Sequence, residues 1–509
     1  MVFSINDEST WRVTPENPVR EVNGMDWERC AALHNLILTL GWAAGGKPES
    51  EMPRETWWQT HITDPALEAE WSARLSPTLK QFFQAAFEEA PDQSFFYYVR
   101  GLSCPENLFE TCHEDEGTMC LYPLADPNMG SDPDGLNFDQ EMSRAIFHVD
   151  ISDYSITNNG RTVWDPLEVV FTAWLGMIDS GKIVATSSPV RGPGEADPWE
   201  LLPYSQMDLQ AAVGYFDNLI LKIESLVENP SLKPKDNPED QAKLVALATA
   251  KFDAPRSPNE MGLISKEALD RAGLNQGFVR DFFTSVRRPK ANIKYIGPGL
   301  RLPTESDFSP LPLQNVDIPQ LFPNPVLPIP LFVTGTRSTS PIFERYPLQD
   351  LPNLPYGLWT TYVNRDGDHV FEDGCRLFLP FNIGASGFAR RTDNTLIGEN
   401  LKSAKARPSG QRNELYQTGY NHFIPLHEPQ LADVLGQWQA IVEAGLWEVD
   451  EEGVVGGIEK FKEADTEDGS YIYQLHMKCY DPIDIPRQRS VFRAGLDGYS
   501  VMRENPETG

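Results

Sequence analysis

The sequence predicts an α+β protein that contains an internal duplication. Two observations support this prediction. Short apolar runs typical of strands alternate with amphipathic stretches typical of helices. One arrangement of these elements, strand, strand, helix and strand, also recurs in the second half of the 509-residue chain. We expect additional helices and a proline-rich extended arm around the two copies.

The predicted duplication rests on short matches that occur in the same order in both halves. Each copy has a glycine after acidic residues, followed by an apolar run that contains a proline, and Gly117 and Pro123 match Gly374 and Pro380. An amphipathic helix with a terminal glycine comes next. Its matched residues are Leu167, Val170, Trp174 and Gly181 in the first copy and Leu431, Val434, Trp438 and Gly445 in the second. Tyr98-Val99 and Tyr362-Val363 match upstream, and Glu195-Ala196-Asp197 and Glu463-Ala464-Asp465 match downstream.

The two matched helices have clear start and stop signals. Apolar residues recur three, four and seven positions apart, which predicts one buried face on each helix. Asp165 is expected to cap the first helix, with Pro166 at its first position. Gly181 and Gly445 are typical of the residue that ends a helix. Short strands are expected directly after them, at 183–184 and 447–449.

The rest of the chain divides by composition. Helical patterns cover 27–42, 76–89, 207–227 and, in two parts, 241–283. Residues 303–355 are rich in proline, which lacks an N–H donor, so we expect an extended arm packed on a domain surface. The expected regions are a mostly helical N-terminal region (1–94), the first copy (95–210), a helical insert with a basic segment (211–300), the arm (301–355), the second copy (356–480) and a C-terminal tail (481–509).

Charge and targeting signals exclude several classes of protein. The chain has 74 acidic and 43 basic side chains, a net charge of −31, which disfavours binding to nucleic acids and to anionic membranes. The first residues lack the basic and apolar regions of a signal peptide, and the apolar runs are too short to span a bilayer. The six cysteines form no Cys-x-x-Cys pair. We therefore expect a cytoplasmic protein.

One segment runs against the overall acidity. Between Arg280 and Arg301 basic residues far outnumber acidic ones. Arg287, Arg288 and Lys290 are therefore candidate ligands for an anionic cofactor or substrate. The alternative is that these cations pair with acidic side chains elsewhere in the chain. A small-residue loop, Gly384-Ala-Ser-Gly387, likewise predicts either an anion nest or a tight turn.

A possible iron site comes from Phe147-His148-Val149-Asp150, which has the pattern of a strand. Ligands two positions apart on a strand point to one side, so His148 and Asp150 fit part of a facial triad for Fe(II). The candidates for the third ligand, and for catalytic histidines in general, are His369, His422 and His427. The alternative is that these histidines are hydrogen-bonded within the protein.

Three functions follow from these patterns. The first is an enzyme that acts on a small organic molecule in a cleft between the two copies, because clefts commonly form at domain interfaces. The second is a non-catalytic protein whose copies bind a protein partner. The third is a non-heme iron oxygenase that uses His148 and Asp150. The chain contains no Walker A motif, no dinucleotide-binding glycine motif and no nucleophile elbow, so the reaction, the substrate and the oligomeric state stay open.

Overall fold

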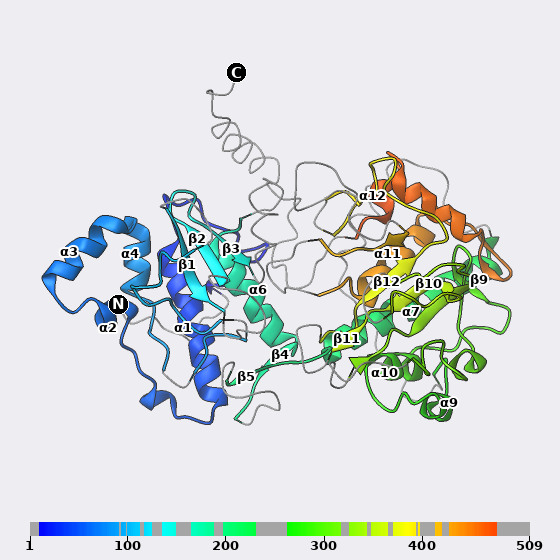
Figure 1. Cartoon of the computed structure of the whole chain (residues 1–509), viewed down its shortest axis with the longest axis horizontal. Helices are drawn as coiled ribbons and strands as arrows, with labels where there is room; N and C mark the ends of the chain where they lie inside the picture. The colour runs from blue at the N-terminus through cyan, green and yellow to red at the C-terminus, as the bar shows by residue number, and fades with distance from the viewer. Residues whose placement is uncertain are drawn as a thin grey trace, which may run out of the picture. The chain divides into compact units, whose positions relative to one another are not determined.

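The computed structural model describes most of the chain, and the statements below refer to its described residues. These are residues 10–90, 93–97, 99–111, 117–124, 135–148, 164–187, 197–230, 262–316, 325–343, 348–364, 370–392, 395–397, 413–419 and 427–475. The chain divides into two compact units (Figure 1). Unit 1 comprises Met1–Leu202, His422–Pro425 and Lys478–Gly509, and unit 2 comprises Pro203–Asn421 and Leu426–Met477. Helices and strands occur in both units, which confirms the α+β class.

Helices make up the first part of unit 1. They are α1 (Trp27–Ala44), the 3-10 helix η2 (Glu49–Glu51), α2 (Trp57–His61), α3 (Pro65–Arg74), α4 (Pro77–Phe83) and, later in the chain, α6 (Leu167–Asp179). Side-chain caps explain several of the starts, because Thr56, Asp64 and Ser76 each accept a hydrogen bond from the backbone of the helix that follows. Helix α1 packs against α6 (Figure 1).

The helix expected at 76–89 is shorter than its pattern predicts. Helix α4 ends at Phe83, a turn follows over residues 84–86, and Phe87 then forms an isolated antiparallel bridge with Thr56. Trp57 N donates to Ala86 O at 3.0 Å, and Glu88 N donates to Glu55 O at 2.8 Å. These bonds to residues far away in sequence replace the bonds that a longer helix would make.

Two small antiparallel sheets complete unit 1. The first has the order β1-β2-β3 and contains β1 (Thr118–Pro123), β2 (Gly135–Asp139) and β3 (Arg144–His148). The second pairs β4 (Ile183–Ala185) with β5 (Trp199–Leu201). Aromatic residues pack between these elements. The ring of Trp174, which is fully buried in α6, stacks on Phe96 at a centroid distance of 4.9 Å.

Unit 2 is built on an eight-stranded sheet. Its order is β13-β12-β10-β9-β7-β6-β15-β14, and all neighbours are antiparallel except β15 and β6. The strands are β6 (Tyr295–Gly297), β7 (Leu300–Arg301), β9 (Pro330–Arg337), β10 (Pro355–Thr360), β12 (Cys375–Phe378), β13 (Glu414–Leu415), β14 (Val449–Asp450) and β15 (Gly453–Val454). A separate pair joins β8 (Pro325–Val326) to β11 (Val363–Asn364).

Two long helices of unit 2 pack on each other, α7 (Gln206–Glu228) and α11 (Leu431–Glu443). The shorter helices are α9 (Lys266–Arg271), α10 (Phe278–Ser285), η4 (Glu305–Phe308), η5 (Ile458–Asp465) and α12 (Ser470–Tyr473). Within the described ranges of both units, no helix combines the length and apolarity that crossing a bilayer requires.

Part of the proline-rich region contributes to the core, which differs from the surface arm that the sequence predicts. Strand β9 lies inside the eight-stranded sheet, between β7 and β10. Its only proline is Pro330, the first residue, so the rest of the strand has its N–H donors for the sheet. Leu331 and Phe332 of this strand are buried in the core of unit 2.

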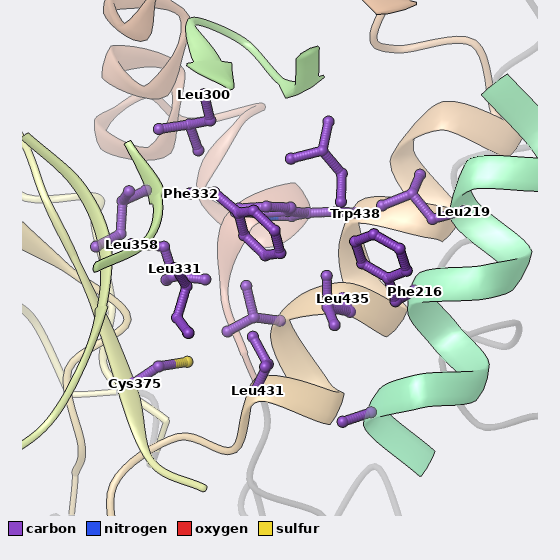
Figure 2. Packing of buried hydrophobic residues seen from close by; sticks show 14 of the residues in the cluster. Phe216, Leu219, Leu300, Leu331, Phe332, Leu358, Cys375, Leu431, Leu435 and Trp438 are labelled. Carbon is purple, nitrogen blue, oxygen red and sulfur yellow. The ribbon is translucent and has the colours of Figure 1, made fainter. Parts of the chain in front are cut away.

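Trp438 is central to that core (Figure 2). Its ring projects from α11 to the side of Phe332 of β9, with the two ring centroids 6.0 Å apart. The indole N–H donates to Tyr416 Oη at 2.9 Å, so the only polar atom of this fully buried side chain is satisfied.

The two helices that match in sequence also match in local structure. Helices α6 and α11 have 13 residues each, and a glycine with positive φ follows two residues after each helix ends, 71° at Gly181 and 74° at Gly445. In both, the residue after this glycine donates a backbone hydrogen bond back into the helix, Lys182 N to Met177 O at 2.9 Å and Leu446 N to Ile441 O at 3.1 Å. The strand pairing after the helices agrees as well, because β4 pairs antiparallel with β5, and β14 pairs antiparallel with β15.

Other matched positions do not correspond in structure. Strand β1 is at the edge of a three-stranded sheet, whereas its counterpart β12 is interior to an eight-stranded one. Asp197 comes before β5, but Asp465 lies in η5, after β15. The shared part is therefore the helix, its cap and the strand pair, and a duplication of the whole copy stays a prediction.

Candidate acid–base site

The segment 85–89 of unit 1 carries two consecutive acidic side chains, Glu88 and Glu89. Its backbone is fixed on one side by the two bonds to Glu55 and Trp57 described above. Trp57 is fully buried, and it begins α2, which follows the capping residue Thr56. The two acidic residues therefore stand on an extended segment held against the start of a buried helix.

Helix α1 fixes the same segment from another side. The Asn35 amide behaves like a neighbouring strand, because its Oδ1 accepts from Phe87 N at 2.8 Å and its Nδ2 donates to Ala85 O at 3.1 Å. His34 Nε2 lies 2.8 Å from Phe87 O, and since a carbonyl only accepts, this nitrogen carries the proton. His34 Nδ1 then accepts from Tyr122 Oη at 2.7 Å. Burial lowers the pKa of His34 to about 4, so this neutral form is present at pH 7.

The carboxyl group of Glu89 rests directly on the backbone of a second segment. A Cβ atom added to Gly101 would lie 1.9 Å from Glu89 Cδ, so no larger residue fits at Gly101 while the carboxyl keeps its place. Leu102 N donates to Glu89 Oε2 at 3.4 Å. Burial, reinforced by the negative charge of Glu88, raises the pKa of Glu89 to about 8. Glu89 is therefore mainly a neutral carboxylic acid at pH 7.

Glu88 has a different environment. Its Oε1 lies 3.3 Å from Nε2 of His61, the last residue of α2, and the two side chains are 20% and 23% exposed. Among the described residues, the buried Oε2 of Glu88 accepts no hydrogen bond. The His61 ring is in turn held near Trp57, with centroids 5.0 Å apart. The site thus combines a neutral acid, a buried carboxyl oxygen that accepts no hydrogen bond from the described residues and a partly exposed imidazole.

The sequence-predicted iron ligands are placed only in part. His148 ends β3 and is fully buried, with the amide of Asn137 3.3 Å from its Nδ1. Asp150, His369 and His422 lie outside the described residues. In the parts of the chain that the structure does describe, no three His, Cys, Asp or Glu side chains are grouped so that they could hold a metal ion.

His427 belongs to a buried polar cluster in unit 2. Its Nδ1 donates to Glu428 O at 2.6 Å, and its Nε2 lies 3.4 Å from Asp373 Oδ1. The ring stacks on Phe371, and Gln430 donates to the other oxygen of Asp373 at 2.7 Å. His427 and His148 therefore both have the environment of a hydrogen-bonded core histidine, the alternative that the sequence left open.

The basic segment pairs with groups of the chain itself. Arg287 Nη2 lies 3.3 Å from Glu224 Oε2, and Lys290 forms an ion pair with Glu228. Arg288 donates to the carbonyl of Gly262 at 3.2 Å. These contacts match the second interpretation of the segment, pairing within the chain, and binding of an external anion by these three side chains stays a prediction.

Sequence reasoning did not single out Glu88 and Glu89. With 74 acidic residues in the chain, adjacency in sequence identifies no acid–base pair. The helical pattern over 76–89 also predicts that both lie on a helix. The features that distinguish them, the clamp by Asn35 and the close approach of Gly101, join segments distant in sequence and give no local signal.

Comparison of the chain with models of protein families, with curated proteins and with solved structures finds no match.

Proposed function

We propose that the protein is a cytosolic enzyme that acts on a small organic molecule by general acid–base catalysis at Glu88 and Glu89. The observation that carries this proposal is the pair of consecutive carboxyl groups with unlike environments, one seated on the Gly101 backbone and one beside His61. Two titratable groups whose surroundings separate their proton affinities are a recurring arrangement in acid–base enzymes.

Each residue has a definite role in this proposal. Glu89 donates a proton to the substrate, because a group with a pKa of about 8 is protonated at pH 7 and still transfers its proton readily. Leu102 N contacts Oε2, so the proton of the neutral acid resides on Oε1. Glu88 Oε2 accepts a proton from the substrate or from water, while His61 holds Oε1.

The supporting residues all lie within unit 1. The sequence alone suggested a cleft between the two copies, and that location stays a separate prediction. No observation on the described residues favours the interaction-protein or the iron-oxygenase alternative over the acid–base proposal.

The test combines a direct titration with a substrate panel. Carbon-13 NMR of Glu carboxyl groups in the full chain, assigned by comparison with Glu89→Gln, should show one group that titrates near pH 8. Chromogenic esters, glycosides and phosphate esters cover the common reactions of a carboxyl pair. Any turnover should fall by about 10²–10⁴-fold in Glu89→Gln and in Glu88→Gln.

Glu55→Gln is the matched control, because the side chain of Glu55 is exposed and only its carbonyl contacts the site. It should leave turnover unchanged. A Glu89 carboxyl that titrates near pH 4.5 would remove the basis of the proposal. Turnover that persists in both Gln variants would show that another site is responsible.

A further inference from the structure

A loop in unit 2 presents three backbone N–H groups to one carboxylate. Ser386 N donates to Asp465 Oδ2 at 2.8 Å, and Phe388 N and Ala389 N both donate to Oδ1 at 3.0 Å. The donors belong to a loop between the core residues Ile383 and Ile397, whereas Asp465 ends η5. The contact therefore joins two segments far apart in sequence.

The glycines of this loop explain why its N–H groups converge. Gly384 has a φ of 88° and Gly387 a φ of 79°, a region that other residues rarely adopt. A Cβ atom on Gly384 would also lie 2.4 Å from Ile397 O. When successive residues alternate between right-handed and left-handed backbone conformations, their N–H groups point to one side. They then form a concave anion site, called a nest. The sequence left a nest and a tight turn as alternatives, and the loop is both.

The bound carboxylate is firmly placed. Phe461 and Ala464 of η5 are buried in the core of unit 2, so Asp465 is held over the loop by its own helix. Burial acts to raise the pKa of Asp465, but the N–H groups of Ser386, Ala389 and Phe388 outweigh it and keep the pKa below its usual value. The carboxylate is therefore ionised, as an anion ligand must be.

We propose that the loop 384–389 is a binding site for a small oxyanion that the chain fills with its own Asp465 carboxylate. The carboxylate is a built-in ligand that fastens η5 to the loop. Because N–H donors recognise the oxygen atoms rather than the rest of the molecule, phosphate or acetate takes the same place once the carboxylate is removed. This proposal concerns unit 2 and does not depend on the acid–base site.

The test uses Asp465→Ala in the full chain, with Glu467→Ala as the control that removes an exposed acidic side chain two positions away. Thermal unfolding is followed in potassium phosphate, potassium acetate and potassium chloride at matched ionic strength. Asp465→Ala should melt lower than the control in chloride. Phosphate and acetate should then raise its melting temperature saturably, by about 2–4 °C more than they raise that of the wild type or the control.

Two results would overturn the proposal. The first is an Asp465→Ala protein with no saturable gain in either oxyanion. The second is a wild-type protein with the same gain, since a filled nest has no room for a second anion. If Asp465→Ala does not fold in chloride, recovery of folding in phosphate is the supporting result. If phosphate does not recover it, Asp465→Asn decides, and wild-type stability of that variant refutes a role for the charge.

Discussion

The raised pKa of Glu89 makes the stability of the protein depend on pH in a defined direction. The folded state binds a proton at Glu89 up to about pH 8, while the unfolded chain releases it near pH 4.5. A raised pKa in the folded state contributes stability that is fully present below pH 4.5 and is lost as pH rises toward 8. The free energy of unfolding therefore falls with pH, by about 1.4 kcal/mol per pH unit at most.

Glu89→Gln isolates this effect because glutamine is similar in size and cannot ionise. Between pH 5.5 and 7.5 the stability of the wild type should fall relative to that of the variant by about 1–3 kcal/mol, the lower values reflecting partial contact of the carboxyl with water. Urea unfolding of both proteins at several pH values measures the difference in their free energies of unfolding. The other titrating groups contribute equally to both proteins, so their contributions cancel. Parallel curves for the two proteins over this range would refute the reasoning, because they would mean that Glu89 titrates as it does in the unfolded chain.

Four further substitutions have expected outcomes. Gly101→Ala should displace the Glu89 carboxyl toward water and lower the pKa of Glu89, which carboxyl NMR would register as a titration at lower pH, and an unshifted titration would contradict the contact. Trp174→Ala and Trp438→Ala should each destabilise the protein by about 3–5 kcal/mol, measured by urea unfolding, because both rings are fully buried. Gly181→Ala should cost about 1 kcal/mol in the same assay, since its Cβ meets no atom within 4 Å and only the positive φ opposes it, and a much larger loss would indicate a clash.

Local patterns predicted the elements whose causes are local. Helices α6 and α11 begin and end close to where their apolar periodicity and the glycines Gly181 and Gly445 place them. The helix expected at 76–89 failed beyond Phe83, because Glu55 and Trp57 offer backbone partners that a single stretch of sequence does not reveal. Hydrophobic periodicity depends only on the residues of one segment, whereas backbone hydrogen bonds to other segments depend on the tertiary fold.

In the candidate sites, too, the sequence indicates the residue types but not their tertiary partners. His148 and His427 were chosen from residue type and spacing, and the structure gives them buried neighbours, Asn137 and Asp373, that nothing in their local sequence indicates. Gly384 and Gly387 predicted a special loop correctly, but its ligand, Asp465, comes from a segment well over 70 residues away. Residue chemistry can thus be listed from sequence, while the partners that determine its role come from tertiary structure.

The clamp on segment 85–88 also has a consequence for hydrogen exchange. The amide protons of Phe87 and Glu88 are each donated to an acceptor in another part of unit 1, the Asn35 side chain and the Glu55 carbonyl. They can exchange with solvent only when these bonds open, which requires α1 or the segment before α2 to separate from them. The acid pair therefore stands on a slowly exchanging backbone, and its two carboxyl groups keep their unlike surroundings for as long as unit 1 stays folded.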